Sequence, residues 1–326
     1  MPARRRNPRR VLAMTRTALS LTLLAAVLVC LLHASPARAA PPIRVYVSIT
    51  GSDANQCTFA SPCHSVQHAH DVVQAGGEIR MLDPGSYGLL IITKAISILG
   101  DGHGGIAASN NAVAITINAG PNDIINLRGL IIEGFGTGFS GVIFNTGASL
   151  NIQDSIIRNF AFDGVVFQPT AASQLNVRQT IIEHFGGLSI AVAIAPSGSG
   201  SAKVVLDNVA VDSSLDGVYA NGSNTSGSII MTVADSVISN NGSFGIGGAS
   251  TNGAIQIMVR NCTISNNNEG IESNGSPVVI RVTRSTITAN NTGVLAGNSG
   301  LLISYGDNNI DGNTANGSPT STIVYH

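Results

Sequence analysis

Residues 150–160 read LNIQDSIIRNF and residues 175–185 read LNVRQTIIEHF, and both stretches follow one pattern of apolar and polar positions. The pattern recurs around one apolar anchor, at Ile132, Ile157, Ile182, Val211, Ile238, Ile264, Ile287 and Ile310. Seven steps separate the first anchor from the last, about 25 residues per repeat. A period of this length, with one supersecondary unit in each repeat, predicts a solenoid.

The pattern inside each repeat indicates strands. Apolar residues stand seven and five positions before the anchor, as at Leu150 and Ile152. A period of two is typical of a strand with one buried face. The third position before the anchor carries a turn-forming residue in five repeats: Asp154, Asn208, Asp235, Asn261 and Asp307. We therefore expect a corner there.

A second corner is expected shortly after the anchor. The aligned residues are Phe135, Phe160 and Phe185 in the early repeats and Asn241, Asn267, Asn290 and Asn313 in the later ones. This predicts an aromatic stack that gives way to an asparagine ladder, with the asparagines themselves in the left-handed backbone conformation. A third short strand begins at pairs such as Gly217-Val218. Three strands and three corners per repeat predict an all-β fold, a three-faced parallel β-helix.

The first 39 residues have the pattern of a secretory signal peptide. A basic start is followed by an apolar run over residues 18–32 and by Ala37-Arg38-Ala39, which are suited to cleavage. We therefore expect a protein that is secreted or periplasmic. The apolar run is shorter than the roughly 20 residues of a membrane-spanning helix, and no later segment is apolar for as long, so we expect no membrane span.

Removal of this segment changes the charge balance. Seven of the 17 Lys and Arg residues lie within residues 1–39 and all 18 acidic residues lie after it, which leaves 10 against 18, a net charge of −8. Without basic clusters, such a surface argues against nucleic acid and anionic membranes as partners.

Three cysteines follow the predicted signal peptide. Cys57 and Cys63 lie close together in CTFASPC, and in an oxidising compartment this predicts a small disulfide loop. Cys262 occupies a repeat position that mostly carries Ser or Thr, which favours a buried structural thiol.

The open end of a solenoid needs a cap. Ser61-Pro62 predicts the start of a helix, with Val66, Ala69 and Val73 on its apolar face. We assign this helix as the N-terminal cap. The expected organisation is a cap with the first strands over residues 40–95 and β-helix coils over residues 96–326.

The chain resembles secreted proteins of the pectin-lyase-like superfamily. The resemblance rests on VYVSITGSDANQCTFASPC (residues 45–63), the expected helix, GGEIRMLDPGSYG (76–88), ITKAISILGDG (92–102) and coils of the DSxIxNNxxGI kind. It implies a right-handed parallel β-helix. The superfamily includes polysaccharide lyases, glycoside hydrolases, esterases, copper-maturation proteins and adhesins, so the fold does not fix the function.

In enzymes of this superfamily the substrate lies along the outer face of the first strand of each coil. By position, the resemblance points to Asp154, Arg178 and Asp207 on three successive coils as the candidate catalytic group. Uronate lyases of this fold use acidic calcium ligands and a basic residue that removes a proton from the sugar. Asp154 and Asp207 are accordingly the candidate calcium ligands, and Arg178 the candidate base.

Other polar features have simpler interpretations. The row Glu133, Arg158, Glu183 and Asp212 is interpreted as structural pairing between neighbouring strands, and GDGHGG (residues 100–105) as turns. Two functions therefore compete. One is binding of an extracellular carbohydrate, or cleavage of a uronate-type polymer by a polysaccharide lyase or a glycoside hydrolase. The other is a non-catalytic adhesive or surface-structural solenoid.

Overall fold

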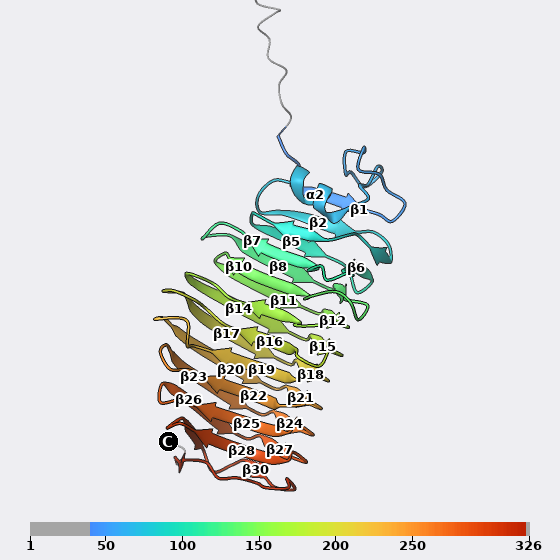
Figure 1. Cartoon of the computed structure of the whole chain (residues 1–326). Helices are drawn as coiled ribbons and strands as arrows, with labels where there is room; N and C mark the ends of the chain where they lie inside the picture. The colour runs from blue at the N-terminus through green and yellow to red at the C-terminus, as the bar shows by residue number, and fades with distance from the viewer. Residues whose placement is uncertain (1–39, 324–326) are drawn as a thin grey trace, which may run out of the picture. The chain divides into compact units, whose positions relative to one another are not determined.

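The computed structural model describes residues 40–323, so the predicted signal peptide lies outside the described residues. From residue 42 to residue 323, the chain winds as a right-handed parallel β-helix (Figure 1). Each full coil contributes one strand to each of three parallel sheets of twelve, ten and nine strands. The predicted fold class is confirmed. Among the described residues, no helix has the length and hydropathy needed to cross a membrane.

The first strand of each coil lies in the twelve-stranded sheet. Its strands are β1 (Arg44–Val47), β2 (Gly77–Met81), β5 (Ile96–Leu99), β8 (Ile124–Arg128), β11 (Ser149–Gln153), β14 (Ala172–Arg178), β17 (Ser201–Asp207), β20 (Ser228–Ala234), β23 (Ala254–Arg260), β26 (Val278–Thr283), β29 (Leu301–Ser304) and β31 (Ser321–Thr322).

The second and third strands form the other two sheets. The ten-stranded sheet contains β3 (Gly85–Ser86), β6 (Gly104–Ala107), β9 (Ile131–Glu133), β12 (Ile156–Arg158), β15 (Ile181–Glu183), β18 (Ala210–Asp212), β21 (Val237–Ser239), β24 (Thr263–Ser265), β27 (Thr286–Thr288) and β30 (Asn309–Ile310). The nine-stranded sheet contains β4 (Leu90–Ile92), β7 (Ile115–Asn118), β10 (Val142–Thr146), β13 (Val165–Phe167), β16 (Ile190–Ile194), β19 (Asp216–Asn221), β22 (Phe244–Ala249), β25 (Glu269–Asn274) and β28 (Thr292–Gly297).

The eight predicted anchors form one continuous row in the ten-stranded sheet. Ile132 pairs in register with Ile157, which pairs with Ile182, and the row continues strand by strand to Ile310. The anchors from Ile132 to Ile287 are almost completely buried, because alternate residues of each strand point into the core. The repeat alignment made from the sequence is therefore the register of the structure.

The first predicted corner is confirmed at four of its five positions. Asp154, Asn208, Asp235 and Asn261 take left-handed backbone conformations, with φ between 50° and 54°. Asp and Asn tolerate this region better than most residues with a side chain. Asp307 does not adopt it.

The predicted asparagine ladder is present inside the second corner. Each side-chain amide donates to the amide oxygen of the next coil, at 2.8 Å from Asn241 to Asn267, 3.0 Å from Asn267 to Asn290 and 2.9 Å from Asn290 to Asn313. The first three are at most 3% exposed. Hydrogen bonding along the stack satisfies polar groups that would otherwise destabilise the core.

Two details of this corner differ from the prediction. The left-handed conformation falls one residue before the ladder, at Asn240, Asn266 and Ala289, because the ladder side chains must point inward. Phe135 is 65% exposed and adopts the left-handed conformation itself, so it does not stack with the buried Phe160. An aromatic stack does exist elsewhere, inside the nine-stranded sheet.

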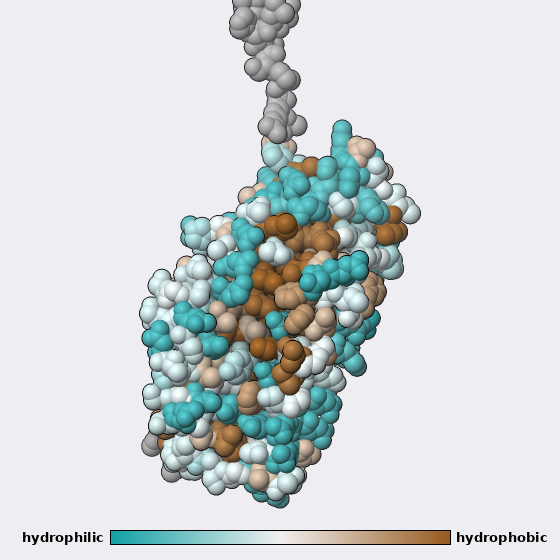
Figure 2. Space-filling view, in the orientation of Figure 1, coloured by the Kyte–Doolittle hydropathy of each residue, from teal (hydrophilic) through white to brown (hydrophobic). Residues whose placement is uncertain are grey.

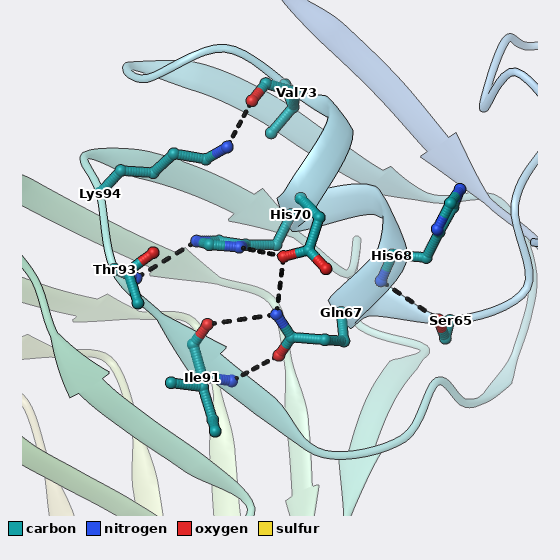
Figure 3. Close-up of polar contacts among 9 residues, drawn as sticks. Ser65, Gln67, His68, His70, Val73, Ile91, Thr93 and Lys94 are labelled. Atoms are coloured by element: carbon teal, nitrogen blue, oxygen red, sulfur yellow. Dashed lines mark hydrogen bonds and ion pairs between the residues drawn. The ribbon is translucent and has the colours of Figure 1, made fainter.

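Helix α2 (Val66–Val72) covers the N-terminal end. Its N-cap is Ser65, whose hydroxyl accepts from the amide of His68, and not Ser61 as expected, because the chain around Ser61 pairs with Thr58 in a bridge. Figure 3 shows that Gln67 forms two hydrogen bonds with the open edge of β4. Its Oε1 accepts from the amide of Ile91, and its Nε2 donates to the carbonyl of Ile91. One side chain thus takes the place of a missing strand.

The last described residues close the opposite end, for which the sequence showed no pattern. Strand β31 pairs with β29, so the chain folds back to add a strand to the twelve-stranded sheet. Thr320 strengthens the return, since its hydroxyl donates to the carbonyl of Leu302 and accepts from the amide of Leu302.

The cysteine predictions are confirmed. Cys57 and Cys63 form a disulfide with Cα atoms 4.6 Å apart. Cys262 is free and buried, and burial raises the pKa of its thiol to about 11. A thiol that is protonated and inaccessible in this way is structural.

Candidate functional site

The outer face of the twelve-stranded sheet carries a ladder of side-chain amides. Asn126 donates to the hydroxyl of Ser97 at 3.1 Å, Asn151 donates to Asn126 at 2.9 Å, and Asn176 donates to Asn151 at 2.8 Å. The strands are paired in register, so these side chains share one row. Each amide in the row has further donor and acceptor capacity, which a polar ligand can use.

A pocket of about 460 Å³ lies beside this ladder, near the corner that leads to the ten-stranded sheet. Leu99 forms part of it and stands in register between Arg80 on β2 and Arg128 on β8. Asp101 and Asp154 complete the charged lining. The leucine is shorter than the arginines on either side, so the two guanidinium groups border the hollow.

Ion pairs hold the arginines of this pocket in place. Nε of Arg128 lies 3.1 Å from a carboxylate oxygen of Asp154, and Nε of Arg80 lies 2.7 Å from Oε1 of Glu78. Burial would raise the pKa of Glu78, but hydrogen bonds and charge from Arg80 and Arg44 outweigh it and hold the pKa below its ordinary value. The pocket therefore presents fixed charges of both signs.

The three residues predicted from the sequence lie along the same edge of the sheet without forming one cluster. Asp154 lines the pocket and pairs with Arg128 of the preceding coil. Arg178 and Asp207 are register partners on β14 and β17, beyond the pocket. None of residues 40–323 forms an ion pair with Arg178, whose side chain is exposed. A catalytic role for these residues stays a prediction.

The geometry does not support a calcium site at Asp154 and Asp207. Strand β14 lies between β11, which Asp154 follows, and β17, which carries Asp207, so the two carboxylates are two coils apart. Calcium takes six to eight oxygen ligands. Among the described residues, these two do not belong to any group of three acidic, His or Cys ligands close enough to share a metal ion. We derive no chemical step through calcium.

Sequence reasoning missed Arg80 and Asp101. Arg80 lies 48 positions before Arg128 and in a coil that precedes the first aligned anchor, so the repeat alignment did not reach it. Asp101 belongs to the glycine-rich segment that was interpreted as turns. The outward position of Arg128 was visible in the pattern, but its partner and its pocket were not.

The nine-stranded sheet presents a different outer face. Its central outward row is mixed, with apolar side chains at Ile91, Ile143, Val166, Ala193 and Leu295 and polar ones at Thr116, Tyr219 and Glu272. Figure 2 shows hydrophobic surface gathered along the middle of the viewed side of the β-helix. Polar groups occur on this sheet too, because Gln168 donates to Asn145 and Asn145 donates to Asn118, each at 2.8 Å.

Comparison with known proteins supports the fold. No protein-family model matches the chain, and no curated protein matches it in sequence. Among solved structures, pectate lyase Pel9A is 14% identical, with a TM-score of 0.55 over 83% of this chain and 71% of that one. The A-module of mannuronan C-5 epimerase AlgE6 from Azotobacter vinelandii is 14% identical, with a TM-score of 0.46 over 80% and 95% of the two chains. At 14% identity, the likeness to pectate lyase Pel9A establishes the parallel β-helix fold and nothing finer.

Proposed function

We propose that this protein is exported and binds an extracellular polysaccharide along the outer face of its twelve-stranded sheet. The observation that carries the proposal is the pocket bordered by Arg80 and Arg128, which lies next to the Asn126–Asn151–Asn176 ladder. Sugar hydroxyls both donate and accept, so they match a surface of amides, guanidinium groups and carboxylates. The signal-like residues 1–39 and the structural likeness to a pectate lyase agree with this proposal.

The charge of the site favours a neutral polysaccharide. The two arginines of the pocket are matched by Asp101 and Asp154, and the chain after residue 39 carries a net charge of −8. A polyanion would meet repulsion from the molecule as a whole and no local excess of positive charge. Binding of a polyuronate in place of neutral polymers would contradict this part of the proposal.

Calorimetric titration of the mature protein with neutral and acidic polysaccharides tests the proposal. We expect Arg128→Ala to weaken binding of the preferred polymer about tenfold, because it removes one guanidinium from the pocket. Arg260→Ala is the matched control: Arg260 lies on the same sheet and pairs with a corner aspartate, Asp235, at 3.2 Å, but lies outside the pocket. Equal loss in both variants, or no binding by the wild type, would reject the site.

A catalytic alternative is a polysaccharide lyase in which Arg178 acts as the base. It is favoured by the exposed, unpaired guanidinium described above, whereas Arg128 and Arg260 are engaged by aspartates. A lyase releases unsaturated sugars that absorb near 235 nm, and Arg178→Ala should abolish that signal. Reducing ends without this absorbance indicate a hydrolase, and the absence of both products across the panel leaves the binding function alone.

Retention of cells on a coated surface, without any saccharide binding, would favour an adhesive solenoid.

A further inference from the structure

A second pocket, of about 290 Å³, lies on the outer face of the ten-stranded sheet. Gly105 and Ala107 on β6 form its floor, and their register neighbours on β9 are the larger Ile131 and Glu133. This step from small to large side chains creates the hollow. His103, Phe135 and Arg158 complete the lining, with an exposed aromatic ring at the rim.

Phe135 is an unusual residue for its place in the fold. Its φ is 50° and its side chain is 65% exposed. In other coils the left-handed residue of this corner falls one position earlier in the repeat and is polar or small: Asn159, His184, Ser213, Asn240, Asn266 and Ala289. A bulky residue in this conformation is strained, and strain of this kind collects at functional sites. Neither burial nor backbone preference accounts for a phenylalanine here.

The charged groups around the ring are held rigidly. Glu133 accepts from Nε of Arg158 at 2.8 Å, from Nδ2 of Asn159 at 2.8 Å and from the amide of Phe135 at 3.0 Å. These bonds fix the backbone that carries the ring and leave the outer nitrogens of the Arg158 guanidinium for a ligand. An aromatic face with a few fixed polar groups is a common design of ligand pockets.

The two pockets lie on either side of one loop. Asp101 and Gly102 line the first pocket, and His103 lines the second. The loop is closed by hydrogen bonds from Gly104 to Gly100 and from Gly102 to Gly129, both at 2.8 Å. Residues 100, 102 and 104 are glycines, and a side chain at Gly102 would meet no atom within 4 Å. The top of the loop is therefore bare at Gly102, between the side chains of Asp101 and His103, whereas Gly100 and Gly104 pack closely against Gly129 and Met81.

We propose that the pocket formed by His103, Phe135 and Arg158 is a second carbohydrate-binding site, and that one oligosaccharide crosses the Gly100–Gly104 loop to occupy both pockets. The inference rests on the proposed function, since the first pocket holds one end of this ligand. A sugar ring packs its C–H face on Phe135 while its hydroxyls bond with Arg158 and His103. The oligosaccharide then lies across the glycine-rich loop at Gly102, where no side chain blocks it.

Ligand length provides the test. The probes are neutral xylo-oligosaccharides and cello-oligosaccharides, from disaccharides to octasaccharides, titrated calorimetrically into the mature protein. A disaccharide occupies one pocket, whereas an octasaccharide reaches both and gains about 100-fold in affinity, because its second contact is intramolecular. Equal affinity for short and long probes would overturn the bridging model.

The variant Phe135→Asn is expected to lose ligand binding while keeping the stability of the fold. Asparagine suits the left-handed corner, so we expect the thermal midpoint of this variant to equal or exceed that of the wild type. In this variant the affinity for the octasaccharide should exceed the affinity for the disaccharide by less than about threefold. Leu188→Ala is the control, since Leu188 is 76% exposed and lines neither pocket. Saturation-transfer NMR adds a direct reading: ligand protons should receive saturation from the Phe135 ring in the wild type and lose it in the variant.

The variants distinguish the two proposals. Loss of long-probe affinity in both Arg128→Ala and Phe135→Asn supports both. Loss in Arg128→Ala alone overturns the second site and leaves the proposed function intact. Loss in Phe135→Asn alone rejects the first pocket and keeps the second, and no loss in either variant rejects both.

Discussion

Glu133 on β9 is a partly buried glutamate and Glu272 on β25 a buried one, and the two lie on outer faces of the β-helix in opposite surroundings. The side chain of Glu133 is 13% exposed and accepts hydrogen bonds from Arg158, Asn159 and a backbone amide. Glu272 is 8% exposed and accepts from Asn274 at 3.2 Å. Its other charged neighbours are the carboxyl groups of Glu269 and Asp216.

These surroundings move the two pKa values in opposite directions. Burial alone would raise the pKa of Glu133, but its three donors outweigh burial and lower it. Burial raises the pKa of Glu272, and repulsion from Glu269 and Asp216 adds to that rise. The comparison shows that burial destabilises the charged form of a carboxylate, and that donors or charges on the neighbouring coils determine whether this destabilisation is offset.

The largest effect is expected from Glu133→Gln. The lowered pKa means that Glu133 stabilises the fold above the ordinary value of 4.5, and that this contribution is lost as the pH falls through the folded-state pKa. We expect the variant to be less stable at pH 7 by about 2 kcal/mol, since charged hydrogen bonds are replaced by weaker ones. Urea unfolding followed by circular dichroism should show the difference from wild type shrinking towards pH 3. A constant difference at all pH values would contradict the assignment.

A smaller effect of opposite sign is expected from Glu272→Gln. The raised pKa means that Glu272 favours the folded state only while protonated, and that this advantage disappears as the pH rises through the folded-state pKa. The variant should be more stable than wild type at pH 8, by about 1 kcal/mol, and equal to it near pH 4. Thermal midpoints at both pH values measure this. Destabilisation at pH 8 would show that Glu272 has a compensating partner after all.

The smallest effect is expected from supplying the missing cation. Leu295 is the register partner of Glu272 on β28 and is 39% exposed, so Leu295→Lys places an ammonium group beside the carboxylate. We expect about 0.5 kcal/mol of added stability at pH 8, reduced by salt, and an NMR-detected pKa of Glu272 below the wild-type value. Leu295→Met is the neutral control. An unchanged pKa would mean that repulsion, and not lack of a cation, dominates at Glu272.

Much of the fold could be predicted because a solenoid repeats its local rules. The anchors from Ile132 to Ile310 gave the register of a whole sheet, and Asp154, Asn208, Asp235 and Asn261 marked a real corner. The N-terminal cap was recognised, although its N-cap was placed at Ser61 in place of Ser65. Sites were less predictable. Asp154 lines the candidate pocket, but Arg80 and Asp101 lie before the aligned repeats, and Phe135 was placed in a stack that does not include it.

The sequence by itself determined the β-helix, its period, its core rows and its disulfide, because alternation and repetition act over short distances along the chain. Only the tertiary structure decided which charges meet. Gln153, the residue before Asp154, has an arginine in register on each neighbouring coil, Arg128 and Arg178, and Asp154 forms an ion pair with Arg128. Nothing in the sequence indicates that Glu272 has acidic neighbours and no cationic one. Side-chain pairing and desolvation depend on atoms from coils about 25 residues apart and on the corners between them, and these arrangements form only when the coils stack.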